Sequence, residues 1–139
     1  MSGAFGADAQ IYKSDSMKLR FRKNSLRFRL NQVEVTRLAS GEKLIEEIWF
    51  PGADRPFRYS LGVRDAAAAE LGSSDIAAWL SRADVIAWAR SGEMELHRSI
   101  ATGHDPLKLM VEKDLVCVDG PDEERDPDAF PRSAAAICK

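Results

Sequence analysis

The sequence is poor in the residues on which cross-links and metal sites depend. It holds two cysteines and two histidines among 139 residues. Two cysteines do not make a disulfide framework, so we expect Cys117 and Cys138 to be reduced thiols. His97 and His104 lack the close paired spacing that a zinc or iron site needs. We therefore expect no metal and no cofactor.

Long apolar runs are also missing. No stretch approaches the roughly 20 residues that a membrane span requires. The opening "MSGAFGADAQ" lacks the basic start and apolar stretch of a secretion signal. We expect a soluble, cytoplasmic protein without a membrane partner. The net charge of -2 argues against a surface devoted as a whole to nucleic acid.

Motifs of known catalytic chemistry are absent as well. The sequence shows no glycine-rich phosphate loop, nucleophile elbow or dinucleotide fingerprint. An enzyme hypothesis rests on a candidate pocket of His97, Glu112, Asp114 and Cys117. However, Cys117 ends an apolar strand beside acidic neighbours, which favours a buried, inert thiol. An enzyme is therefore less expected than a non-enzymatic protein.

The composition, 45% hydrophobic and 30% charged, is that of one globular domain. Residues 1–16 are small and polar without a sustained period, so we predict a flexible N-terminal extension. Residues 17–118 form the predicted single α+β domain. Residues 119–139 form a predicted acidic C-terminal tail.

Alternating apolar and charged residues predict strands from residue 18 onward. In "KLRFRKNSLRFRL" leucine and phenylalanine alternate with lysine and arginine, and "KNS" marks a turn or a bulge. Further strands are expected in these ranges: 43–50, 57–63, 75–80, 94–100 and 107–118. The alanine-rich stretch 64–74 predicts a short helix or an ordered linker.

Two similar stretches, "RLNQVEVTRLASGE" (29–42) and "WLSRADVIAWARSGE" (79–93), predict the main helices. Asn31 and Ser81 are the expected N-caps, and Glu34 and Asp84 lie three residues further on. Glycine follows each apolar stripe and predicts its end. The similarity indicates scaffold rather than chemistry, because it concerns caps and core positions.

These elements predict an α+β fold with a mostly antiparallel sheet of six to seven strands and two main helices. A strand-helix-strand-strand unit occurs twice in the pattern. It is either a true internal duplication or the result of capping chemistry that uses few residue types.

The first predicted hairpin carries a row of cations. Lys18, Arg20, Arg22, Arg27 and Arg29 share one side of the two strands. Such a face can bind acidic protein segments or track a phosphate backbone. The neighbouring phenylalanines fall on the other side, so base stacking is less expected.

Acidic residues concentrate between positions 112 and 128. A basic face and an acidic C-terminal segment in one chain suggest mutual docking, within one molecule or between two. Charge segregation of this kind favours a binding or regulatory module that contacts another protein or a second copy of itself. Nucleic-acid binding is the alternative. Phe130 and Pro131 are the expected apolar anchor of the acidic tail.

The stretches "NSLRFRL" and "EKDLVC" carry a resemblance to a small bacterial family, catalogued as a domain of unknown function. The resemblance extends from Met17 to about Pro131. It implies no reaction, cofactor or partner. Family members tend to close with asparagine and proline after "FP", whereas this chain continues through "RSAAAICK".

Overall fold

The structure is a computed structural model that describes residues 10–14, 16–114, 128 and 130. The described residues contain two helices, α1 (Gln32–Ala39) and α2 (Arg82–Arg90). They also contain these strands: β1 (Ile11–Lys13), β2 (Lys18–Arg22), β3 (Ser25–Leu30), β4 (Lys43–Ile48), β5 (Phe57–Arg64), β6 (Ala68–Leu71), β7 (Asp75–Ser81), β8 (Glu95–Ile100) and β9 (Leu107–Lys113).

The α+β class and the two main helices are confirmed, but the mostly antiparallel single sheet is wrong. The strands form a five-stranded sheet, β1-β4-β5-β7-β6, and a four-stranded sheet, β2-β3-β9-β8. Each sheet joins antiparallel hairpins through a central parallel pair, β5 with β7 or β3 with β9. Alternation along a sequence predicts strands and their sides, but it carries no information on distant partners.

Two segments differ from their predicted structure. The alanine-rich stretch forms β6, which pairs antiparallel with β7, because pairing and packing override the helix propensity of alanine. In the predicted flexible extension, residues 11–13 form β1 and pair in parallel with β4. The prediction of a flexible extension is therefore wrong for residues 11–13. Ser14, which follows them, is buried.

The predicted N-caps of both helices are confirmed. Asn31 and Glu34 form a reciprocal capping box, in which each side chain accepts from the backbone N–H of the other residue. Ser81 accepts from the N–H of Asp84 at 3.0 Å. Gly41, with φ of 98°, follows α1 in a conformation that glycine adopts without strain.

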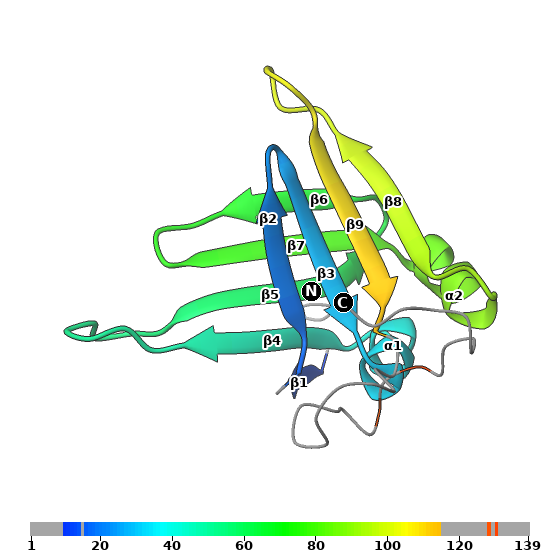
Figure 1. Ribbon diagram of the computed structural model, residues 1–139, viewed down its shortest axis with the longest axis horizontal. Coiled ribbons are helices and arrows are strands. Elements are labelled where there is room, and N and C mark those ends of the chain that lie inside the picture. The colour runs from blue at the N-terminus through cyan, green and yellow to red at the C-terminus, as the bar shows by residue number, and fades with distance from the viewer. Residues whose placement is uncertain (1–9, 15, 115–127, 129, 131–139) are drawn as a thin grey trace, which may run out of the picture.

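The core lies between the two sheets and the helices, which sit at one end of the molecule (Figure 1). Phe28, Leu61 and Leu80 are fully buried there, and each such side chain contributes about 1.5–3 kcal/mol by leaving water. The four-stranded sheet crosses the front of the five-stranded sheet, whose β4–β5 and β6–β7 hairpins extend beyond β2 (Figure 1).

Candidate functional site

The first hairpin carries the basic face, defined here as the outer sides of β2 and β3. Cross-strand register places Lys18 opposite Arg29 and Arg20 opposite Arg27. The intervening residues of β3 are buried, so the cations lie on the side turned away from the core. The structure thus brings together on one face the predicted residues Lys18, Arg20, Arg22, Arg27 and Arg29.

Glu112 on β9 partners the arginines of β3. Its carboxylate accepts from Nε and Nη2 of Arg29 at 3.0 and 2.8 Å. Nε of Arg27 lies 3.8 Å from the other oxygen of the same carboxylate. Parallel pairing of β3 with β9 produces this contact, since Arg29 and Glu112 are register partners.

Lys18 is engaged at the end of the face. Its Nζ lies 3.2 Å from a carboxylate oxygen of Asp114. Asp114 is buried, and its backbone N–H donates to the carbonyl of Leu30 at 2.7 Å. The pair therefore joins β2 to the residue just after β9.

Arg20 and Arg22 differ from the other three cations. Both are exposed, and within the described part of the chain neither forms an ion pair. Arg20 also lies directly opposite Arg27, an arrangement of like charges that destabilises a sheet. This half of the basic face is electrostatically unsatisfied by the described residues.

The second predicted cluster is divided among different partners. His97 lies on β8, and its Nε2 is 2.7 Å from the carboxylate of Glu95. The hydrogen bond from His97 holds the pKa of Glu95 below its ordinary value. Glu112 contacts arginines and Asp114 contacts Lys18, whereas Cys117 lies outside the described residues. In the described ranges no group of three His, Cys, Asp or Glu side chains is placed to hold a metal ion.

Sequence reasoning missed the continuation of the face onto the neighbouring strands. Lys108 lies opposite Ser25, and Glu95 lies opposite Glu112, on the same outer side. The alternation in "LKLMVEK" could have indicated Lys108. The place of Glu95 depends on the pairing of β8 with β9, which the sequence does not show.

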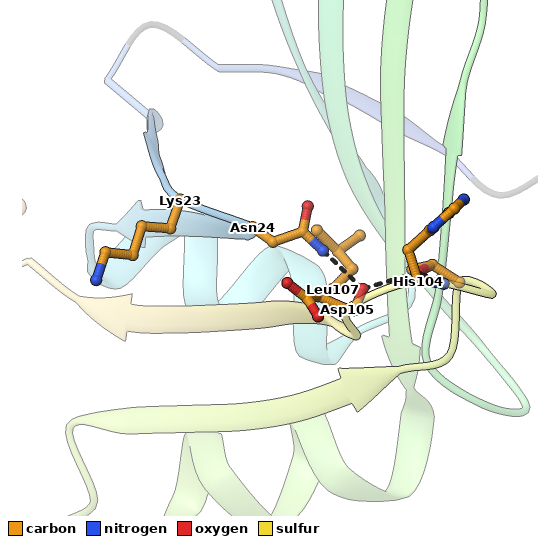
Figure 2. Close-up of a pocket in the computed structure, with 6 residues that line it drawn as sticks. Lys23, Asn24, His104, Asp105 and Leu107 are labelled. Atoms are coloured by element: carbon orange, nitrogen blue, oxygen red, sulfur yellow. Dashed lines mark hydrogen bonds between the residues drawn. The ribbon is translucent and has the colours of Figure 1, made fainter.

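A hollow of about 870 Å³ lies between the β2–β3 turn and the β8–β9 loop (Figure 2). The amide of Asn24 donates to the carbonyls of Asp105 and Pro106 at 2.9 and 3.0 Å, which ties the two tips together. The side chains of Lys23 and His104 point away from each other (Figure 2). The polar groups do not converge on one ligand position, so this hollow is a weaker candidate than the basic face.

A buried carboxylate was also missed. Glu34, which is 1% exposed, accepts hydrogen bonds from the hydroxyls of Ser14 and Ser16. Asn31 donates its side-chain amide to the hydroxyl of Ser16 at 2.8 Å. This cluster fixes the chain entering β2 against the start of α1, so its evident role is structural.

Beyond Asp114, the structure describes two residues, Asp128 and Phe130. Phe130 packs against the core, and its N–H donates to the carbonyl of Asp114. The carbonyl of Asp128 accepts from the N–H of Gln32 at 2.7 Å. The acidic residues between Asp114 and Asp128 lie outside the described part of the chain, as does Pro131.

Comparison with known proteins gives a family and no activity. Residues 17–134 match a family described as "Family of unknown function (DUF7009)". The chain belongs to this family, as the resemblance of its sequence motifs indicated. No curated protein and no solved structure matches it. Within the described residues, neither helix has the length and apolar character to span a membrane.

Proposed function

We propose that this protein is a non-enzymatic binding module whose basic face binds an acidic segment of another protein. The observation that carries the proposal is the pair Arg20 and Arg22, exposed and without an ion pair among the described residues. Arg20 and Arg22 lie on a strand of a sheet, so their backbone is already ordered before a ligand binds. An acidic partner would relieve the repulsion between Arg20 and Arg27.

A protein partner is favoured over nucleic acid by the position of the aromatic rings. Single-stranded nucleic acid is held by stacking of its bases on exposed aromatic side chains as well as by cations. Phe28 is fully buried, and Phe21 lies on the opposite side of β2 from Arg20 and Arg22. The face therefore offers cations without a stacking platform.

The enzyme hypothesis has less support. His97, Glu112 and Asp114 are each engaged by a different neighbour, namely Glu95, Arg29 and Lys18. General acid-base chemistry needs groups that meet at one reacting atom. Glu112 and Asp114 instead balance part of the positive charge of the basic face.

The proposal is tested by binding of a labelled glutamate-rich peptide to the full chain, measured by fluorescence anisotropy. We expect binding at about 50 mM salt that weakens strongly at about 500 mM, because exposed charges are screened over shorter distances. Charge reversal in the double variant Arg20→Glu/Arg22→Glu should abolish it. Reversal of two exposed arginines on α2, Arg82→Glu/Arg90→Glu, is the control with the same change in charge and should leave binding unchanged.

Light scattering of the unliganded full chain identifies a second copy as the partner if a salt-sensitive dimer is found. Tighter binding of single-stranded RNA or DNA than of the peptide would instead favour the nucleic-acid alternative. Peptide binding that is equal in the arginine variant and the wild type would remove the proposal.

We also propose that the chain arose from an internal duplication and acts in the cytoplasm of a bacterium. The duplication is supported by the equivalent order of the hairpins, β2-β3-β9-β8 in one sheet and β6-β7-β5-β4 in the other. The cytoplasmic location is supported by the sparse cysteines. We further propose that the chain divides into one domain at 17–118, to which β1 is added, and an acidic tail at 119–139.

A further inference from the structure

β2 is the terminal strand of the four-stranded sheet. It pairs with β3 on one side, and no described strand pairs with its other side. Backbone N–H and C=O groups along such an edge can accept a further strand. The edge of β2 is thus able to receive an extended segment of another chain.

The side chains of β2 differ in character on its two sides. Arg20 and Arg22 point to the outer side, while Leu19 and Phe21 share the inner side with the buried residues of β3. Phe21 nevertheless remains 59% exposed. A strand beside β2 would meet cations on one side and apolar side chains on the other.

The five-stranded sheet continues beyond β2 on the inner side (Figure 1). Register places Ile48 and Leu71 on the same side of that sheet as the core residues Leu44 and Leu61. They are 42% and 81% exposed, because the four-stranded sheet does not cover the ends of β4 and β6. Among the described residues, none covers these two side chains, so the core is open at this edge in the described part of the chain.

We propose that the acidic partner binds as an added strand along β2, with acidic and apolar residues alternating in its sequence. Its acidic side chains pair with Arg20 and Arg22. Its apolar side chains cover Phe21 and the exposed inner residues Ile48 and Leu71. This inference rests on the proposed function and adds the conformation and sequence pattern of the partner.

Charge complementarity selects this occupant over β2 of a second copy. Antiparallel pairing of β2 with itself would place Lys18, Arg20 and Arg22 beside the same cations of the other copy. Like charges on neighbouring strands are destabilising, and charged edge strands commonly prevent self-association. The same cations attract an acidic strand.

The test compares two peptides of identical composition with the full chain. In one, glutamate alternates with valine over a length that spans β2, and in the other the glutamates and valines form two separate blocks. Affinity is measured by anisotropy, and protection of the amides of residues 18–22 by hydrogen exchange. The variants are Phe21→Ser and Leu71→Ser, with Ile11→Ser on the outer side of β1 as a control whose exposure lies between those of Phe21 and Leu71.

We expect the alternating peptide to bind about tenfold more tightly than the blocked peptide, since only it presents both kinds of side chain to the correct sides. Phe21→Ser and Leu71→Ser should each weaken the alternating peptide by about tenfold. Ile11→Ser should have no effect, and amides on β2 should exchange more slowly in the complex.

Equal binding of both peptides, lost on Arg20→Glu but unaffected by Phe21→Ser, would overturn strand addition and leave the basic face as a binding surface. Binding of neither peptide would overturn both proposals. A dimer of the unliganded chain that Phe21→Ser disrupts would assign this edge to a second copy and overturn the inference.

Discussion

Tyr59 shows how a single buried polar group contributes to this fold. Its hydroxyl donates to the carbonyl of Met17 at 2.7 Å and so connects β5 to the residue that precedes β2. Burial, together with the negative charges of Glu46 and Glu34, raises the pKa of Tyr59 to about 12. The neutral phenol is the form that the folded protein favours.

This shift predicts a loss of stability at high pH. The pKa of Tyr59 in the folded state lies above its ordinary value of 10.0. The contribution of Tyr59 to the free energy of unfolding is therefore complete below pH 10 and declines as the pH rises toward 12. Tyr59→Phe should lower the free energy of unfolding by about 1–2 kcal/mol at pH 7. The difference between wild type and variant in urea unfolding should shrink above pH 10. A difference that stays constant to pH 11 would contradict this assignment.

At the level of single residues, the sequence predicted which side chains form the basic face but not how they differ. Alternation alone placed the five cations on one side. Arg29 has an ion-pair partner and Arg20 has none among the described residues, and this distinction depends on Glu112, which lies 83 residues beyond Arg29 in sequence. Such a contact follows from sheet topology, which alternation does not encode.

At the level of elements, local signals predicted the helices well. Capping residues act within one turn, so Asn31 with Glu34 and Ser81 with Asp84 could be recognised directly. The failures were β1 and β6, which are edge strands. Their conformation depends on β4 and β7, to which they pair, because three and four residues are too few to show a strand pattern of their own.

The two helices allow a matched prediction at their third positions. Glu34 is buried and accepts from Ser14, Ser16 and the N-cap, whereas Asp84 is partly exposed and pairs with Arg98 at 2.8 Å. Glu34→Ala should lower the free energy of unfolding by about 2–4 kcal/mol, because buried donors lose their acceptor. Asp84→Ala should cost about 0–1 kcal/mol, as for other exposed pairs.

Urea unfolding of both variants against the wild type measures these costs. The substitutions occupy equivalent helix positions, so a difference in cost measures what Glu34 has and Asp84 lacks, namely the buried serine cluster and the hydrogen bond from the backbone N–H of the N-cap. Equal costs for the two variants would contradict a special role of the cluster that surrounds Glu34.

At the level of the whole molecule, the two sheets share one strand arrangement but differ in the side chains that they expose. Each joins two hairpins through a parallel pair, and between them they enclose one core. The four-stranded sheet carries the basic face on its outer side. At its β2 edge that face meets the opening of the core, where Phe21 and Leu71 are exposed.

The most direct test of the central claim is a map of where an acidic ligand contacts the full chain. Amide NMR spectra are recorded while a glutamate-rich peptide is added at low salt. We predict that the largest shift changes fall on residues 18–22 and on Arg27 and Arg29, and that they disappear in Arg20→Glu/Arg22→Glu. Changes centred instead on the hollow between Lys23 and His104, or scattered without relation to β2, would contradict the account.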